Sequence, residues 1–403
     1  MLTQEQLSLY FQRIGFDYQP IQTTGPSLQL LRLIQAHQLM SIPYETLSLH
    51  WRPIIPQNDL TDDIQHDKRK PKFLSPPFGL STEDLFRKLV VDHRGGYCLE
   101  LNILLGEVLQ ALGFEVVLAK AKVVFDYDRI SERLKKEASK DGVSEEEVRE
   151  LESFEGVDTS GWETHQMLLV GIPSSSFTSP SLLSLSPDST PAVKKRYLVD
   201  VGLAKYSLLD PIELPTDNTA SSTQGRGVMG KQFQISSHHH TGILSISDNS
   251  EYNNSEDIIR WNLSVRMGNN SQIWYPYYTF LEKEATFAEL MQIHYYMSLS
   301  TTSTSPPEPC AVKPLLRCGR DDGAIELMGQ VSMQGMKLTI QHASGSGYYP
   351  KADEEKGGME VVLAKDEEEQ AHLFQKYFGI EGYKDGAVLV LAGDDDQIGA
   401  DIW

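Results

Sequence analysis

The spacing of apolar residues changes at Gly113, and this change limits the folds open to the chain. Before Gly113, apolar side chains recur every three or four residues, as they do on the buried face of a helix. After Gly113, they fill short runs separated by turn-forming residues, which is typical of strands. A helical part followed by a part of short strands predicts an α+β chain of several domains.

Helix signals in the first part indicate where individual helices begin. Thr3, with Gln6 three residues later, has the pattern of a capping box, and Ser27 precedes a second helical run. The other expected elements of this part are helices at 84–91 and 99–112 and a loop at 53–77, where Pro, Asp and Lys are frequent.

Short strands joined by turns after Gly113 predict a small barrel or sandwich. Two stretches interrupt it: 131–155 is highly charged and predicts a solvated helix, and 174–189 is rich in Ser and Pro and predicts a mobile loop. A helix at 286–297 then leads to a mixed α/β unit. The expected strands are 114–118, 122–127, 166–172, 196–201, 231–235, 241–246, 258–265 and 273–280, and the last unit has strands at 312–317, 324–328 and 337–341 and a helix at 366–378.

Composition limits the setting and the partners. Three cysteines in 403 residues are too few for a disulfide framework, so we expect a reducing, cytoplasmic setting. The formal net charge of −20 argues against nucleic acid as a partner. No basic, apolar leader begins at Met1 and no apolar run approaches the roughly 20 residues of a membrane span, so we expect no membrane partner.

One cysteine has the setting of a nucleophile. Cys98 follows the pair Gly95-Gly96 and comes where the helix at 99–112 is expected to begin. Backbone N–H groups and the positive dipole end at a helix N-terminus favour the thiolate, which is the form that attacks electrophiles. Two glycines would let the backbone turn sharply and leave the sulfur approachable. The alternative for a lone cysteine is a buried structural thiol, which is our interpretation of Cys310 and Cys318.

A histidine and an aspartate later in the chain are candidate partners for Cys98, because a nucleophile needs a base and a group that orients the base. His165 lies at the edge of the expected strand 166–172, and Asp200 lies in an apolar run. A carboxylate is costly to bury there unless it is paired, and His165 is a suitable partner if the two strands are adjacent. Taken singly, His165 could be a satisfied strand histidine and Asp200 could cap a turn. Together with Cys98 they predict a Cys-His-Asp triad.

The residues around these three positions resemble the motifs of the arylamine N-acetyltransferase family. The segment 94–102 resembles the family's RGGxCxE-N motif, Thr164-His165 its T-H motif, and 200–202 its DVG motif. The long insertions resemble those of fungal members. Further similarities are 13–15 and 42–47 to the amino-terminal signatures and 377–380 to the carboxy-terminal signature, with Thr46 in place of an asparagine and His294 in a segment that usually carries one.

The resemblance implies three domains around a cysteine-protease-like Cys-His-Asp core. A helical bundle at 1–112 would carry the catalytic Cys98. A β-barrel at 113–282, with insertions near 128–160 and 174–195, would carry His165 and Asp200. An interdomain helix and an α/β lid would follow at 283–403.

The same resemblance implies acetyl transfer by a ping-pong reaction. Asp200 would orient His165, and His165 would take the proton of Cys98. Cys98 would then accept the acetyl group of acetyl-CoA, release coenzyme A, and pass the group to an aromatic amine, hydrazine or hydroxylamine. Malonyl-CoA is the alternative donor, since some fungal relatives prefer it.

Further site residues follow from the resemblance. Val124 and Phe125 fall where the family lines its acceptor pocket, and Lys205 is the candidate for the phosphates of coenzyme A. We expect no metal site. His238–His240 lacks further ligands at metal spacing and Gly225–Gly230 lacks the strand-turn-helix setting of a phosphate loop, so a polar turn and a linker are expected there.

Two other classes of protein stay open at this point. A transglutaminase-like or cysteine-protease-like hydrolase would share the order Cys, His, Asp, and a non-enzymatic binding module would share the fold. The extent of the motif similarity argues against the hydrolase. The presence of Cys98, His165 and Asp200 argues against the binding module.

Overall fold

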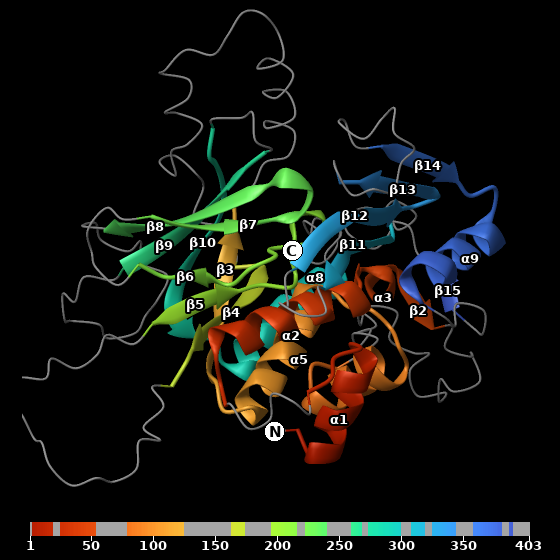
Figure 1. Ribbon diagram of the computed structural model, residues 1–403. Coiled ribbons are helices and arrows are strands. Elements are labelled where there is room, and N and C mark those ends of the chain that lie inside the picture. Colours follow the sequence, from red (N-terminus) through yellow and green to blue (C-terminus); the bar gives the residue numbers. More distant parts are fainter. Residues whose placement is uncertain are drawn as a thin grey trace, which may run out of the picture.

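The computed structural model consists of an N-terminal group of helices and two large sheets (Figure 1). In that view the mostly green eight-stranded sheet and the mostly blue five-stranded sheet lie beside each other, with α1, α2 and α5 below them. The structure describes residues 2–18, 25–53, 79–124, 163–173, 195–215, 222–239, 259–267, 273–299, 308–318, 325–343, 358–380 and 387–389.

The helices of the first part begin where their capping residues predict. The Thr3 side chain accepts the backbone N–H of Gln6, and the Gln6 side chain accepts that of Thr3, so the capping box is confirmed. Ser27 accepts the backbone N–H of Leu30 and begins the second helix, as expected. The helices are α1 (Gln4–Arg13), α2 (Leu28–Ser41), α3 (Leu47–His50), α4 (Thr82–Phe86), which continues into a π-helical turn (Arg87–Val91), and α5 (Cys98–Ala111).

The larger sheet is antiparallel and curls into a nearly closed barrel. Its strand order is β6-β5-β4-β3-β10-β9-β8-β7. The two end strands, β6 and β7, contact each other, and just before β6 the backbone N–H of Leu209 donates to the carbonyl of Arg226 in β7 at 2.8 Å. The strands are β3 (Glu115–Val123), β4 (His165–Gly171), β5 (Arg196–Val199), β6 (Ile212–Glu213), β7 (Thr223–Arg226), β8 (Gln232–His239), β9 (Ile259–Arg266) and β10 (Tyr275–Glu284).

The expectation of two separate strands at 114–118 and 122–127 is wrong, because β3 runs through both as far as Val123. The interrupting Ala-Lys-Ala sequence belongs to the strand: Ala119 and Ala121 are buried, whereas Lys120 forms ion pairs at the rim. Small buried residues that alternate with a lysine weaken the apolar signal without breaking the strand.

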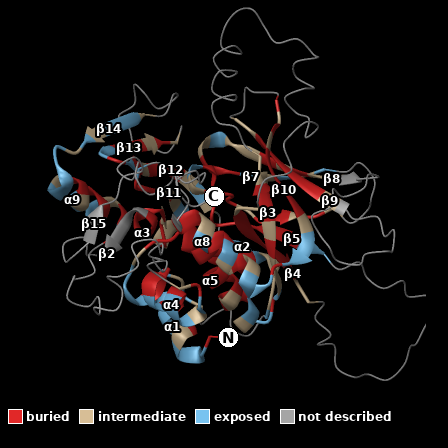
Figure 2. Cartoon of the chain, turned by 180° about the vertical axis from the view of Figure 1, so that it is seen from behind, coloured by how far each residue is buried: buried red, intermediate tan, exposed pale blue. Residues whose placement is uncertain are grey.

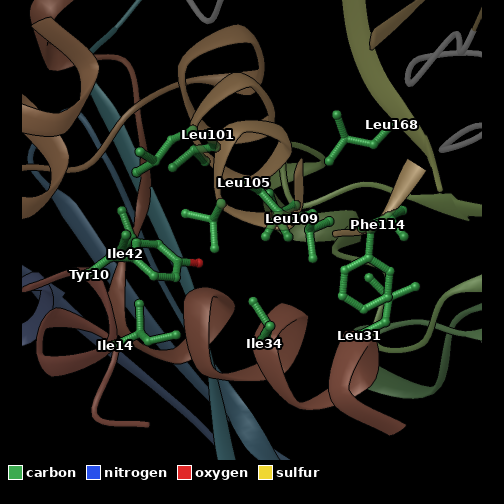
Figure 3. Close-up of a cluster of buried hydrophobic side chains, with 14 of the residues drawn as sticks. Tyr10, Ile14, Leu31, Ile34, Ile42, Leu101, Leu105, Leu109, Phe114 and Leu168 are labelled. Atoms are coloured by element: carbon green, nitrogen blue, oxygen red, sulfur yellow. The ribbon is translucent and has the colours of Figure 1, made fainter. Parts of the chain in front are cut away.

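One face of the barrel packs on the helices. A buried cluster joins these parts and includes Tyr10 of α1, Ile14 directly after α1, Ile34 of α2, Leu105 of α5 and Leu168 of β4 (Figure 3). Burying such side chains contributes about 1.5–3 kcal/mol each relative to exposure. This cluster therefore fixes α5, which carries Cys98, against the strand that begins with His165.

The second sheet joins the two ends of the chain. Its order is β1-β11-β12-β13-β14, and β1 comes from the N-terminal part, where Tyr44 pairs with Val312 of β11. Leu373 and Phe374 of α9 pack on this sheet, and a small pair of strands, β2 and β15, lies nearby. The bounds are β1 (Tyr44–Glu45), β2 (Trp51–Pro53), β11 (Cys310–Cys318), β12 (Ile325–Gln334), β13 (Lys337–His342), β14 (Met359–Leu363), α9 (Glu367–Phe378) and β15 (Ala387–Leu389).

The helix α8 (Phe287–Leu299) packs on the N-terminal end of α5. Its Leu290, Ile293 and Met297 belong to one buried cluster with Cys98. Figure 2 shows buried residues on α8, on α5 and on the strands beside them. Among the described helices, none is long and apolar enough to cross a bilayer.

Two segments that the sequence predicts to be irregular contain strand residues. The stretch 225–230 is no linker, because β7 ends at Arg226 and a 3-10 turn covers Val228–Gly230. His238 and His239 belong to β8, where strand pairing with β9 holds their backbone, so the expected turn at 238–240 is wrong for these two residues. The expectations for 131–155, 174–189 and 241–246, and for the loop beyond Pro53, lie outside the described residues.

Candidate active site

Cys98 is the first residue of α5 and is 5% exposed. Tyr97 before it is extended, and its backbone N–H donates to Glu100 Oε2 at 3.1 Å. A carboxylate in the first turn suits the positive end of the helix dipole. The sulfur therefore lies at a helix N-terminus, as the sequence predicts.

The two glycines before Tyr97 allow close packing at the Cys98 turn. Neither is among the described glycines with positive φ. A Cβ on Gly95 would lie 2.4 Å from the carbonyl oxygen of Pro43, and one on Gly96 would lie 2.8 Å from Glu100 Oε2. Gly96 N donates to that same Pro43 carbonyl at 3.2 Å, so the bare backbone lets the β1 segment lie directly beside the Cys98 turn.

His165 and Asp200 lie next to Cys98. His165 begins β4, Asp200 follows β5, and His165 Nε2 is 2.7 Å from Asp200 Oδ2. The imidazole also makes a side-chain hydrogen bond with Cys98. Burial disfavours the charged imidazole, but Asp200 and Cys98 outweigh it and raise the pKa of His165 from 6.5 to about 10.

Asp200 is fully buried and receives further hydrogen bonds. Asn102 Nδ2 donates to Oδ1 at 3.0 Å and the backbone N–H of Gly202 donates to the same oxygen at 2.9 Å. The Tyr278 hydroxyl donates to Oδ2 at 3.2 Å. These donors offset the cost of burying a carboxylate.

Asn102 ties the three elements of the site together. From α5, its amide donates to the carbonyl of Gln166 in β4 at 2.7 Å, and its Oδ1 accepts the backbone N–H of Val201 at 3.0 Å. Gly202 follows Val201 and lies against Cys98: a Cβ there would be 2.6 Å from Cys98 Cα. The approach of β4, the Asp200 loop and α5 is therefore fixed by contacts of Asn102 and Gly202 with neighbouring backbone as well as by the contacts among Cys98, His165 and Asp200.

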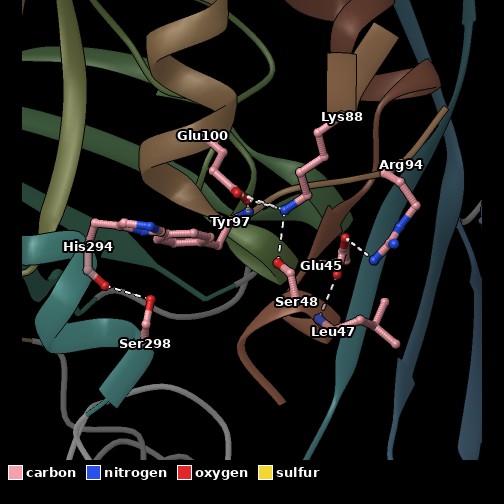
Figure 4. A network of polar contacts seen from close by, with 9 residues as sticks. All are labelled: Glu45, Leu47, Ser48, Lys88, Arg94, Tyr97, Glu100, His294 and Ser298. Atoms are coloured by element: carbon pink, nitrogen blue, oxygen red, sulfur yellow. Dashed lines mark hydrogen bonds and ion pairs between the residues drawn. The ribbon is translucent and has the colours of Figure 1, made fainter. Parts of the chain in front are cut away.

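A buried polar network supports the turn from the other side (Figure 4). Lys88 Nζ donates to both oxygens of Glu100 at 2.7 Å and to Ser48 Oγ at 2.8 Å. Arg94 pairs with Glu45 at 3.3 Å. Arg94 and Glu100 thus tie the Cys98 turn to neighbouring segments through charged hydrogen bonds.

Tyr97 connects this network to α8. Its hydroxyl forms a hydrogen bond with His294 Nδ1, and the two rings are stacked. The sequence singled out His294 only as a departure from the family pattern. No sequence signal marked Tyr278, because an aromatic residue in an apolar strand is typical of a barrel core.

The other residues predicted for the site are Val124, Phe125 and Lys205. Val124 is half-buried just after β3, and its backbone N–H donates to the carbonyl of Tyr277, while Phe125 lies outside the described residues. Lys205 is exposed, with its Nζ 5.5 Å from the centre of the Tyr206 ring. The structure thus brings together Cys98, His165 and Asp200, and it does not bring Val124 or Lys205 into a described contact with them.

Cys310 is a buried cysteine that lies near the candidate site. Burial raises the pKa of its thiol to about 11, and its Sγ accepts a hydrogen bond from Thr46 Oγ1 at 3.4 Å. Tyr44, whose pKa is raised by burial and then by nearby charge, interacts electrostatically with both Cys98 and Cys310. Among the described residues, no three His, Cys, Asp or Glu side chains are grouped so that they could hold a metal ion.

The fold is that of the arylamine N-acetyltransferases. The chain aligns with the solved arylamine N-acetyltransferase of Mycobacterium smegmatis over 93% of its own length and 92% of that chain, with a TM-score of 0.54 and 22% identity. It aligns equally far with the Mycobacterium marinum arylamine N-acetyltransferase in complex with CoA, at 93% and 92%, with a TM-score of 0.51 and 20% identity. The expected α+β architecture, with helices and a central barrel-like sheet, is confirmed.

The sequence shows the same resemblance around Cys98. Residues 73–133 match the N-acetyltransferase family model. An arylamine N-acetyltransferase of Mycolicibacterium smegmatis is 39% identical over 116 residues, or 29% of this chain and 33% of the relative. An N-malonyltransferase of Gibberella moniliformis is 33% identical over 94 residues, or 23% of this chain and 21% of the relative. The chain spans about a third of the length of the curated arylamine N-acetyltransferases it matches. The resemblance to this family that the motifs predict is confirmed.

Proposed function

We propose that this protein is an arylamine N-acetyltransferase, which moves an acetyl group from acetyl-CoA to an aromatic amine through a thioester on Cys98. The observation that carries the proposal is that His165 is hydrogen-bonded to both Cys98 and Asp200. The similar arylamine N-acetyltransferases support the choice of donor and acceptor. In this proposal Cys98 is the nucleophile, His165 moves protons, and Asp200 holds the imidazole.

The first half-reaction charges Cys98. Because His165 Nε2 faces Asp200, Nδ1 is the nitrogen that takes the Cys98 proton. The thiolate attacks the thioester carbonyl of acetyl-CoA, and a bond forms between Sγ and the acetyl carbon. The bond between that carbon and the coenzyme A sulfur breaks, and coenzyme A leaves with the proton that His165 holds.

The second half-reaction transfers the acetyl group. The nitrogen of an aromatic amine attacks the acetyl carbon, the bond to Cys98 Sγ breaks, and His165 takes the amine proton. Val124 and Phe125 are proposed to contact the aromatic ring, because ring burial in an apolar pocket supplies much of the binding energy. Lys205 is proposed to contact anionic groups of the donor.

Malonyl-CoA is the second candidate donor, because an N-malonyltransferase is among the similar proteins. The chemistry at Cys98 would be the same for both donors. A malonyl group carries a free carboxylate, which would need a cation or a hydroxyl close to the bound acyl group.

Intact mass spectrometry of the full chain, mixed with acetyl-CoA or malonyl-CoA and no amine, tests the proposal. We expect wild type to gain one acyl group and Cys98→Ala to gain none, because only Cys98 among the described cysteines has the imidazole beside it. Cys310→Ala is the matched control, since it removes another buried thiol. It should be acylated as wild type is.

Two results would count against the acyltransferase. One is acylation of Cys98→Ala at the wild-type rate, which would remove Cys98 from the reaction. The other is cleavage of a peptide substrate in the absence of any acyl-CoA, which would favour the hydrolase class that shares the same three residues.

A further inference from the structure

Two lysines from different turns of the barrel lie against one aromatic ring. Lys205 belongs to the short turn Ala204–Tyr206, and Lys231 follows the turn Val228–Gly230. Their Nζ atoms are 5.5 Å and 5.2 Å from the centre of the Tyr206 ring. Lys205 is exposed and Lys231 is half-buried, so the pair is partly open to solvent.

This arrangement places like charges together. Burial and, as a smaller effect, the neighbouring Lys205 together lower the pKa of Lys231 from 10.5 to about 8. Lys231 Nζ has a long hydrogen bond of 3.5 Å to the carbonyl of Val228. The face of the Tyr206 ring offsets part of the repulsion between the two cations, and an anion bound between them would offset more of it.

Both turns contain a residue in the left-handed region, which is uncommon without glycine. Ala204, directly before Lys205, has φ of 49°, and Met229 has φ of 56°. Such conformations cost on the order of 1 kcal/mol or more and are found disproportionately at binding and catalytic sites. The backbone beside the two lysines therefore has φ angles that alanine and methionine seldom adopt, and contacts with the rest of the fold hold it there.

The lysine pair lies within reach of a donor bound at Cys98. Lys205 is three residues after Gly202, so their Cα atoms are at most about 11 Å apart, and Gly202 itself contacts Cys98. Tyr206 lies 5.3 Å from Tyr277, ring centre to ring centre, and Tyr277 interacts electrostatically with Cys98. The two turns contact β11 and β12, so the pair lies where the barrel meets the second sheet.

We propose that Lys205 and Lys231 together form an anion site that binds an oxyanion group of the acyl donor. This inference rests on the proposed acyltransferase function and adds Lys231 as a specificity residue. Two groups share the required chemistry: the free carboxylate of a malonyl-type acyl group, and a phosphate of coenzyme A. Each lysine can donate a charge-assisted hydrogen bond to either of them.

The test compares three donors on the full-length protein. Acetyl-CoA carries phosphates only, malonyl-CoA carries phosphates and a carboxylate, and p-nitrophenyl acetate carries neither. The variants are Lys205→Gln, Lys231→Gln and the double variant. Lys283→Gln is the matched control, since Lys283 is an exposed lysine of β10. KM and kcat are measured for each donor.

We expect the double variant to keep its reaction with p-nitrophenyl acetate and to raise KM by about tenfold for a donor whose anion it binds. A rise for acetyl-CoA and malonyl-CoA alike identifies a phosphate. A rise for malonyl-CoA alone identifies the acyl carboxylate and makes the pair a determinant of donor choice. Lys283→Gln should change none of these values.

Other outcomes overturn the inference. KM values for both coenzyme A donors that stay within about twofold of wild type would show that the lysines bind no donor anion. Loss of the p-nitrophenyl acetate reaction along with the others would show that they only hold the fold. If wild type reacts with none of the three donors, the proposed function itself fails. This result differs from the other two, in which wild type reacts and only the variants are compared with it.

Discussion

At the scale of single residues, Tyr278 shares with His165 the same oxygen of Asp200. Tyr278→Phe removes that hydroxyl and leaves more of the charge on Oδ2 for the imidazole. We expect acylation of Cys98 by acetyl-CoA to slow by about threefold to tenfold, because an oriented hydrogen bond to a charged group is lost. The pKa of His165 should rise further, since Asp200 would attract the imidazolium more strongly.

A purely structural role of Tyr278 would slow the reaction without moving the His165 titration. The matched control is Tyr275→Phe, which alters another buried tyrosine of β10. NMR titration of the His165 ring separates the two readings. An unchanged titration in Tyr278→Phe would contradict the positioning role.

His165 also makes stability depend on pH. Its pKa is raised from 6.5 to about 10, so the folded protein holds a proton that the unfolded chain loses between these values. The contribution to the free energy of unfolding is therefore complete below 6.5, shrinks as pH rises through this window, and is lost above about 10. Denaturant titrations of Cys98→Ala with and without His165→Ala measure the part of this contribution that comes from Asp200, because this background removes both the thiol titration and the effect of the thiol on the imidazole. A difference between the two that grows with pH would contradict the assignment.

At the scale of elements, the loop after β5 meets α5 through Gly202 without space for a side chain. In Gly202→Ala, the new Cβ would lie 2.6 Å from Cys98 Cα and 2.7 Å from Cys98 Cβ, so the loop or the helix must move. A displacement of this order can cost about 100-fold in rate, and we expect acylation to fall by at least that factor.

The control for Gly202→Ala is Gly379→Ala at the end of α9. Gly379 has φ of 71° and open space around it, so alanine there should cost stability of about 1 kcal/mol through backbone strain and leave acylation unchanged. Intact mass and denaturant unfolding measure both variants. Normal acylation of Gly202→Ala would show that the contact does not position Cys98.

Elements whose signals are local could be predicted from the sequence. The Thr3 capping box, the Ser27 cap and the helix that begins at Cys98 depend on residues within a few positions of one another. β14 could not be predicted, because Met359 and Leu363 are exposed there and give no pattern of alternating burial.

The candidate triad could be predicted from the sequence, because a buried Asp and a strand-edge His are unusual in apolar runs. Tyr278 and His294 could not, because they look like ordinary core residues.

At the scale of the whole molecule, the contacts that complete the site join distant parts of the chain. β1 pairs with β11, and the glycine pair needs β1 beside it, yet no local pattern in 42–47 indicates a strand partner after residue 300. The same holds for Lys205 and Lys231, whose common contact with Tyr206 depends on how the barrel curls. The sequence therefore indicates the candidate site residues, but it does not indicate the distant segments that pack around them.

The pairing of β1 with β11 has a consequence for synthesis of the chain. Thr46 and Cys310 exchange hydrogen bonds across 264 positions. At about 5–20 residues per second, a ribosome needs roughly 13–50 s to cover that interval. During that time the segment beside Gly96 has been made but lacks its strand partner. A nascent chain thus carries Cys98 and the segment beside it long before β11 can be made.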